Sequence, residues 1–365
     1  MAGPDHYHAA GLAAMRRGDD AKLGQVLELA VAAALGERAE TAAVPHSGRN
    51  EAYLTQKLEL RDGRLVDAAG EAVMMGWELP LMRASAAALS RSCANLDAPR
   101  LLNVGFGLGL IDEALQSAFK GRAAEHTILE AHPDVLAHAR STGWADRHGV
   151  RLLPGRWQTS VPALVEAGES FDAIFYDTYA ESYADLRRFM AHLPSLLSSR
   201  RGACFAYFNG VAAEDPFFHG VYCQLAQHDI AHLPMSAGRK LKLEFEVLRI
   251  GDLDDVVWEG LPKRYWRNPW YLAPLASSIG ANAKDETLPE FSADVAPLLV
   301  REHLAASGGP GVGQAGMGGG RRRRGEGEGG HGLRRAGGEK RTGNKRLNVG
   351  TPGSNQPNSH GRRHA

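Results

Sequence analysis

Apolar segments of strand length alternate with amphipathic helical segments from about residue 50 to about residue 300, and this alternation restricts the fold more than any other feature. Strands separated by helices pair in parallel and are covered by helices on both faces. We therefore expect an α/β fold with a doubly wound, mostly parallel, seven-stranded Rossmann-like sheet. The candidate strands are LLNVGFG at 101, HTILEA at 126, VRLLPG at 150, FDAIFYD at 171, ACFAYFNG at 203, LEFEVLRIG at 243 and YWRNPWYLAPL at 265.

The last two candidate strands lack a convincing helix between them. Parallel strands need a crossover of a dozen or more residues, whereas antiparallel neighbours need only a short connection. We therefore expect the sheet to end in a C-terminal antiparallel hairpin.

Composition divides the 365 residues into three zones. Residues 1–48 are rich in alanine and predict a short helical N-terminal extension, either a small cap or part of an incomplete repeat. Residues 49–303 carry the strands and helices of the main domain. Residues 304–365 are rich in glycine and arginine with few apolar side chains, which predicts a disordered tail. Such a tail can make weak contacts with RNA or acidic partners through its charge, or remain a solvated segment.

Charge and cysteine usage exclude several classes of protein. Basic and acidic residues both number 42, so net charge gives no argument for binding nucleic acid or a membrane. The odd number of cysteines, widely spaced and without a CxxC pair, predicts neither a disulfide framework nor a thiolate metal site. A signal peptide and an apolar run of about 20 residues are both lacking. We expect a cytoplasmic and nuclear protein without membrane contact.

A glycine-rich turn follows the first strand of the main domain. Gly105, Gly107 and Gly109 alternate in VGFGLG before a helix begins near Leu110. Glycine permits a tight turn and lets a ligand approach bare backbone, although this triplet alone is a weak signal. The next strand ends in Glu130, about twenty residues later, where a carboxylate can bind the ribose hydroxyls of a nucleoside. The alternative for Glu130 is an acid that complements a helix N-terminus.

The residues after the glycines indicate which nucleoside fits. A GxxxxGK[ST] phosphate cradle is missing, which argues against a P-loop nucleotide site. Asp112, close to the expected helix start, would repel the pyrophosphate of a dinucleotide. S-adenosyl-L-methionine carries no phosphate but does carry a sulfonium and an amino group, so an acid is tolerable beside it. We expect S-adenosyl-L-methionine as the cofactor and no metal.

Two carboxylates stand in otherwise apolar surroundings. Asp177 follows the strand FDAIFYD, and ligands of doubly wound sheets gather at the carboxyl ends of strands. Its charge therefore points into a cleft beside the glycine turn. Glu78 lies in VMMGWELPLM, where it is either a helix-start acid or a group aimed at a ligand. Both acids are therefore candidates for contact with a ligand.

The blocks VMMGWELPLM, LLNVGFGLG, ILEAHP, GRWQ and FDAIFYDTYAE together resemble the guanidinoacetate N-methyltransferase-like family. The opening block at 53–82 is most similar to the fungal arginine N-methyltransferase 2 group, which methylates the internal δ-nitrogen of a protein arginine. The resemblance implies a methyltransferase sheet and an arginine-bearing protein substrate, with a ribosomal protein as one candidate. It further implies cofactor contacts at Tyr53, Met74, Met82, Phe106, Gly107, Leu108, Gly109, Leu110, Ile111, Glu130, Ala131, His132, Arg156 and Trp157.

The same resemblance implies that Glu78 and Asp177 grip a guanidinium. A planar cation with donors on each edge suits two carboxylates, and Asp177 is our candidate for the group that accepts its proton and also borders the cofactor. Two other functions remain open: methylation of guanidinoacetate to creatine, and a non-catalytic cofactor-sensing or RNA-associated adaptor. The substrate protein, the nitrogen that is modified, the oligomeric state and the role of the tail are not decided by the sequence.

Overall fold

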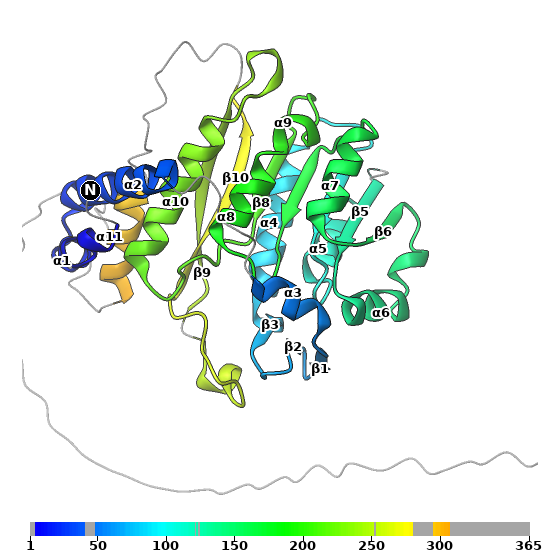
Figure 1. Ribbon diagram of the computed structural model, residues 1–365, viewed down its shortest axis with the longest axis horizontal. Helices are drawn as coiled ribbons and strands as arrows, with labels where there is room; N and C mark the ends of the chain where they lie inside the picture. The colour runs from blue at the N-terminus through cyan, green and yellow to red at the C-terminus, as the bar shows by residue number, and fades with distance from the viewer. Residues whose placement is uncertain are drawn as a thin grey trace, which may run out of the picture. The chain divides into compact units, whose positions relative to one another are not determined.

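The computed structural model describes residues 4–40, 48–120, 122, 125–251, 253–279 and 295–306. Its main sheet has the strand order β6-β5-β4-β7-β8-β10-β9 (Figure 1). Strands β6, β5, β4, β7 and β8 pair in parallel. The strands are β4 (Arg100–Val104), β5 (Glu125–Glu130), β6 (Val150–Pro154), β7 (Ala173–Tyr176), β8 (Cys204–Tyr207), β9 (Leu241–Arg249) and β10 (Trp270–Ser278). All seven predicted strands are present.

The C-terminal end of the sheet is antiparallel, as predicted. β10 pairs with β9 over its whole length and joins the parallel part through β8. It begins at Trp270, five residues after the predicted start, because Arg264, Tyr265 and Trp266 belong to the preceding loop and make other contacts.

Side chains alternate along the strands between two apolar clusters, one on each face of the sheet. On β7, Ala173 and Phe175 pack on one face, while Ile174 and Tyr176 pack on the other. α4, α5 and α6 supply residues to the first cluster, and α7, α8, α9 and α10 supply the second. These helices are α4 (Leu79–Ser92), α5 (Leu110–Ala118), α6 (Pro133–Ser141), α7 (Trp157–Glu166), α8 (Tyr183–Met190), α9 (Leu193–Leu196) and α10 (Pro216–Ala231). The predicted doubly wound fold is confirmed.

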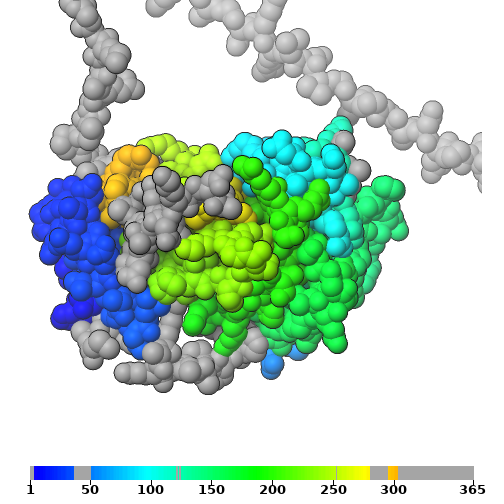
Figure 2. Space-filling view, turned by 90° about the horizontal axis from the view of Figure 1, so that it is seen from above, coloured from blue at the N-terminus to red at the C-terminus, as the bar shows by residue number. Residues whose placement is uncertain are grey.

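Helices from near both ends of the described chain form a further group beside α10. They are α1 (His8–Arg17), α2 (Asp20–Glu40) and α11 (Val295–Ala306), and Figure 2 shows the blue N-terminal helices beside the orange α11. Leu27 and Leu299 are fully buried in the apolar cluster that also contains Ile174 and Tyr176 of β7. α11 includes the first three residues, 304–306, of the expected tail. The remainder of that segment, 307–365, lies outside the described residues.

A small second sheet precedes the main one and was not predicted. It contains β1 (Glu59–Arg61), β2 (Arg64–Val66) and β3 (Ala72–Met75), follows α3 (Gly48–Thr55), and leads through the 3₁₀ helix Gly76–Glu78 into α4. The sequence of this segment shows a family resemblance but no strand pattern, because strands of three or four residues carry too little periodicity. It places Met74 and Glu78 beside the main sheet.

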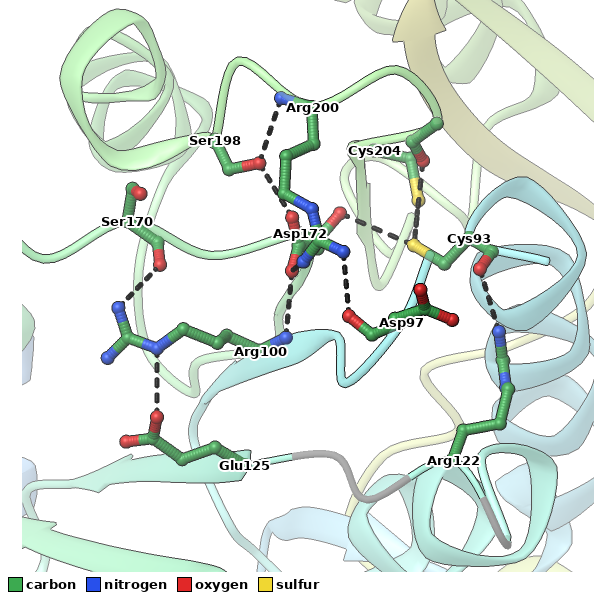
Figure 3. A network of polar contacts seen from close by, with 11 residues as sticks. Cys93, Asp97, Arg100, Arg122, Glu125, Ser170, Asp172, Ser198, Arg200 and Cys204 are labelled. Carbon is green, nitrogen blue, oxygen red and sulfur yellow. Dashed lines mark hydrogen bonds and ion pairs between the residues drawn. The ribbon is translucent and has the colours of Figure 1, made fainter. Parts of the chain in front are cut away.

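A network of charged groups joins the amino ends of the parallel strands (Figure 3). Asp172, buried just before β7, accepts hydrogen bonds from the backbone N–H of Arg100 (2.9 Å), Ser198 Oγ (2.6 Å) and Arg200 Nη1 (2.8 Å). Arg100 in turn donates to Glu125 across to β5. The acids and cations at the amino ends of these strands therefore pair with one another.

None of the described helices has both the length and the apolar character that a membrane crossing requires.

Candidate active site

The strand order reverses between β4 and β7, and in such sheets ligands bind at the carboxyl ends of the strands on either side of the reversal. Gly105 follows β4 and Asp177 follows β7, and the preceding residues Val104 and Tyr176 are register partners. The Asp177 N–H donates to the Val104 carbonyl at 2.9 Å. The predicted position of Asp177 beside the glycine turn is therefore confirmed.

A cleft with about 680 Å³ of empty space, which includes volume open to solvent, lies at this point. Nine of the predicted cofactor residues line it: Tyr53, Met74, Gly105, Gly107, Glu130, Ala131, Arg156, Trp157 and Asp177. They come from α3, β3, the turns after β4, β5, β6 and β7, and the start of α7. The cleft thus gathers residues that are widely separated in sequence.

Met74 covers the glycine turn. Its sulfur lies 3.2 Å from the backbone nitrogen of Leu108, which donates to it. Gly107 has a φ of 53°, and a Cβ there would lie 2.5 Å from the same sulfur. A side chain at this position would therefore displace Met74 from the floor of the cleft.

Glu130 is buried at the end of β5 and supports the glycine turn through hydrogen bonds. Its carboxylate accepts hydrogen bonds from the backbone N–H groups of Phe106 (2.8 Å) and His132 (2.6 Å). Burial raises the pKa of Glu130, and these backbone donors oppose that rise. The carboxylate also borders the cleft, so it joins the glycine turn to the nucleoside position that the sequence suggested.

Seven predicted cofactor residues do not line the cleft: Met82, Phe106, Leu108, Gly109, Leu110, Ile111 and His132. Ile111 is fully buried in the core, and the Phe106 ring packs against Trp144 with their centroids 5.5 Å apart. The His132 ring nitrogen Nε2 lies 3.2 Å and 3.1 Å from the carbonyls of Tyr53 and Gln56. These residues shape the turn and its support, and their direct contact with a cofactor stays a prediction.

The expected position of Asp112 was wrong. We expected this acid to face the cofactor near the start of α5, but it is fully buried among polar side chains of the sheet. Asn103 Nδ2 donates to both of its oxygens, at 2.9 and 3.0 Å, and His126 Nε2 lies 3.1 Å away. Successive side chains on a helix point about 100° apart, so the residue at which α5 begins decides that Asp112 points toward the sheet, and the spacing from Gly109 did not reveal it.

A wider, solvent-open cavity with about 1810 Å³ of empty space adjoins the cleft. Tyr53, Val73, Asp177, Thr178, Tyr179 and Glu181 line both spaces. The wider cavity has an acidic lining of Asp67, Glu71, Glu78, Asp177 and Glu181. Lys263 is the one basic side chain among its described lining residues, and it pairs with Glu214 at 2.9 Å. The cavity therefore suits a cationic group.

Asp177 stands where the two spaces meet. Within the described part of the chain, its carboxylate receives no hydrogen bond and no ion pair. Burial and the charge of Asp112 raise the pKa of Asp177 to about 7. Asp172, at the opposite end of the same strand, is by contrast fully paired. An acid without a partner at a cavity junction is suited to meet a cation from outside the protein.

Glu78 lines the wider cavity from the start of α4 and is 3% exposed. Its Oε1 accepts hydrogen bonds from the Met75 N–H (3.1 Å) and from the Tyr265 hydroxyl. Burial and the nearby charge of Asp177 raise the pKa of Glu78 to about 8, while the two donors act in the opposite direction. Both predicted catalytic acids therefore face one cavity.

Two residues of the site were missed in the sequence. Glu181 accepts hydrogen bonds from Tyr176, Thr178 (2.5 Å), Trp157 (2.9 Å) and Gln158 (2.7 Å), so it ties the loop after β7 to α7. Its position four residues after Asp177 was the available signal. Tyr265 reaches Glu78 from 187 residues away, and nothing local in the sequence indicates that contact.

The sequence is similar to those of known methyltransferases. A family model described as guanidinoacetate N-methyltransferase matches residues 55–213. Protein arginine N-methyltransferase 2 of Yarrowia lipolytica is 38% identical over 60% of this chain and 46% of its own length. The protein of that name from Cryptococcus neoformans is 34% identical over 63% of this chain and 68% of its own length.

This chain spans about half the length of the first curated relatives that it matches. Among solved structures, spermidine synthase from Thermotoga maritima aligns with a TM-score of 0.39 and 14% identity over 65% of this chain and 75% of that one. A similarity this low supports no conclusion about this chain beyond those drawn from its own strand order.

Proposed function

The chain belongs to the protein arginine N-methyltransferase 2 family, and from this membership we propose that it is an S-adenosyl-L-methionine-dependent enzyme that methylates a guanidino nitrogen of arginine in a protein. The observation that carries the proposal is the place of Asp177. This acid, which accepts no hydrogen bond from the described residues, lines both a narrow cleft and a wider acidic cavity. The first space suits a cofactor and the second a cationic substrate.

The residues of the cleft fit S-adenosyl-L-methionine. Bare backbone at Gly105 and Gly107 leaves room for a ligand, Glu130 can accept the ribose hydroxyls, and the Arg156 guanidinium can meet a carboxylate. Arg156 already lies 3.3 Å from the largely exposed Glu51, a pairing of little strength. When bound, the cofactor supplies a methyl group on a positively charged sulfur.

The two catalytic acids divide the work on the substrate. Glu78 accepts hydrogen bonds from one edge of the guanidinium and orients its plane. Asp177 accepts a proton from the nitrogen that gains the methyl group, since a protonated guanidinium is a poor nucleophile. Holding that nitrogen in line with the methyl donor lowers the entropic part of the barrier. Its raised pKa makes Asp177 a better proton acceptor than an ordinary aspartate.

An arginine within a protein chain is favoured over guanidinoacetate. Guanidinoacetate carries a carboxylate that needs a cation, and the described lining of the wide cavity offers Lys263 alone against five acidic side chains. An arginine in a peptide has no such carboxylate beside its side chain. The acidic lining and the width of the cavity both support a chain as the substrate.

Family membership supports two finer points of the proposal. The modified atom is proposed to be the internal δ-nitrogen, and a ribosomal protein is one candidate substrate. A cytoplasmic and nuclear location is supported by the three cysteines, which are buried and unbridged. Weak RNA or acidic-partner contacts through 304–365 remain a prediction from the composition of that segment.

Mass spectrometry tests the proposal. Purified protein is incubated with isotopically labelled S-adenosyl-L-methionine and either a cell extract or guanidinoacetate. We expect labelled methylarginine in extract protein, with fragment ions that place the methyl group on the δ-nitrogen. Labelled creatine without labelled protein would overturn the choice of substrate, and no label in either sample would overturn the activity.

A further inference from the structure

The hydrogen bonds to Glu78 all fall on one of its two carboxylate oxygens. Oε1 accepts from the Met75 N–H at 3.1 Å and from the Tyr265 hydroxyl. Among the described residues, no donor reaches Oε2. Glu78 lines the wide cavity, so the oxygen without a donor is the one available to a ligand.

Tyr265 is itself held in a fixed orientation. The Trp77 ring N–H donates to its hydroxyl oxygen at 3.0 Å, which directs the hydroxyl proton toward Glu78. The Tyr265 ring packs edge-on against Trp258, with their centroids 5.1 Å apart. Trp77 and Glu78 lie in the same 3₁₀ helix, so the ring, the hydroxyl and the carboxylate form one short chain of hydrogen bonds.

From this geometry we infer that Tyr265 is a positioning residue: its hydroxyl fixes Oε1 of Glu78 and so presents Oε2 to the guanidinium of the substrate. This inference rests on the proposed arginine methylation and adds a residue to it. A carboxylate held at one oxygen loses less rotational freedom when the substrate binds, and preorganisation of this kind strengthens binding. Tyr265 acts through Glu78 and has no part in the proton transfer.

The hydroxyl also affects the charge of Glu78. Among the described residues, Asp177 and the Met75 N–H also act on this carboxylate. Burial and the charges of Asp177 and Glu78 in turn raise the pKa of the Tyr271 hydroxyl. Asp177 favours the neutral acid, whereas the two donors favour the carboxylate. Without the Tyr265 hydroxyl, Glu78 would stay protonated to a higher pH and bind a cation less well at neutral pH.

The variant Tyr265→Phe removes the hydroxyl and keeps the aromatic ring. The substrate is the extract protein that the wild type labels, added at a series of dilutions to obtain an apparent KM. We expect this KM to rise about ten-fold at neutral pH with little change in kcat. The weakened contact between Glu78 and the guanidinium stabilises the bound substrate and the transition state equally. The acidic limb of the kcat/KM profile should move to higher pH. Calorimetry should give an unchanged affinity for S-adenosyl-L-methionine.

Two controls separate positioning from general loss of structure. Tyr222→Phe alters a partly buried tyrosine on α10 outside both site cavities and should leave the profile unchanged. In a Glu78→Gln background, Tyr265→Phe should have little further effect on KM, because its action passes through Glu78.

An unshifted pH profile with KM within two-fold of wild type, or full additivity of the two substitutions, would overturn the role of Tyr265. A wild type that transfers no methyl group to extract protein would instead overturn the proposed function, so the two failures are distinguishable.

Discussion

A side chain on Gly105 would begin almost on top of the Asp177 carbonyl oxygen, because an ideal Cβ there lies 1.8 Å from that atom. The backbone after β4 thus runs in direct contact with the backbone after β7. Gly105 also has a φ of 96°, which side chains rarely adopt. Main-chain atoms therefore join the glycine turn of the cleft directly to Asp177, the proposed catalytic acid.

Gly105→Ala should separate the two strand ends and weaken both stability and cofactor binding. We expect a loss in the free energy of unfolding of about 3 kcal/mol, from overpacking together with backbone strain. Calorimetric affinity for S-adenosyl-L-methionine should fall at least ten-fold. Gly143→Ala is the matched control, since Gly143 has a φ of 78° but open space around it. It should cost about 1–2 kcal/mol from strain alone and leave affinity unchanged. Equal effects of the two substitutions would contradict the contact.

Asp177→Asn should remove the proton acceptor while preserving the shape of the site. We expect the kcat for methyl transfer to fall about 100-fold or more, with cofactor affinity retained. Asp146→Asn, an exposed acid on the 3₁₀ helix Trp144–Asp146, should leave kcat unchanged. Initial rates with labelled cofactor measure the effect. A kcat within about three-fold of wild type would exclude Asp177 as the base.

Stability of the ligand-free protein should depend on pH through Asp177. Its pKa is raised from 3.8 to about 7, so the folded state binds the proton more tightly than the unfolded chain does. The stability this gives is complete below pH 3.8 and is lost as pH rises toward 7. Asp177→Asn removes that loss, so its melting temperature should exceed that of wild type at pH 8, with the gap closing near pH 4. Scanning calorimetry at both pH values decides. A variant less stable than wild type at pH 8 would show that the carboxylate has a stabilising partner.

Much of the sheet could be predicted because each strand carries its own apolar run between turn residues. FDAIFYD is such a run, and its final acid could be placed in a cleft because carboxyl ends of parallel strands meet at one edge. The two acids of this segment nevertheless look alike in sequence. Asp172 is paired with Arg200 and the Arg100 N–H, whereas Asp177 has no donor among the described residues, and only the fold separates them.

The remainder of the site depends on contacts between distant segments. Tyr265 meets Glu78 across 187 residues, and the small sheet that delivers Met74 has strands too short to show a period. The direction of Asp112 depends on where α5 begins relative to the sheet, and a shift of one residue turns a side chain by about 100°. Such features follow from packing, which local sequence does not report.

The pairing at the amino ends of the strands should carry stability and not function. Asp172→Ala leaves the Arg100 N–H, the Ser198 hydroxyl and the Arg200 guanidinium without their acceptor. We expect a loss of about 3 kcal/mol in the free energy of unfolding in urea, as for a broken buried ion pair. Asp146→Ala serves as the exposed control and should cost less than about 0.5 kcal/mol. The affinity of the folded fraction for S-adenosyl-L-methionine should stay at the wild-type value. A ten-fold loss of affinity would show that the pairing at the amino ends of the strands also affects the cofactor cleft.

Glu130 should contribute to cofactor binding in two separable ways, by supporting the glycine turn and by meeting the ribose. Its oxygens accept hydrogen bonds from the N–H groups of Phe106 and His132. Glu130→Ala leaves these two donors unpaired and should lower the free energy of unfolding by about 2–4 kcal/mol. Glu130→Gln keeps one acceptor oxygen and should restore part of that stability. Because the amide has lost the charge that strengthens bonds to ribose hydroxyls, its affinity for S-adenosyl-L-methionine should still be about ten-fold below wild type. Calorimetry and thermal unfolding on both variants test this. Wild-type affinity in Glu130→Gln would mean that Glu130 supports the turn without touching the cofactor.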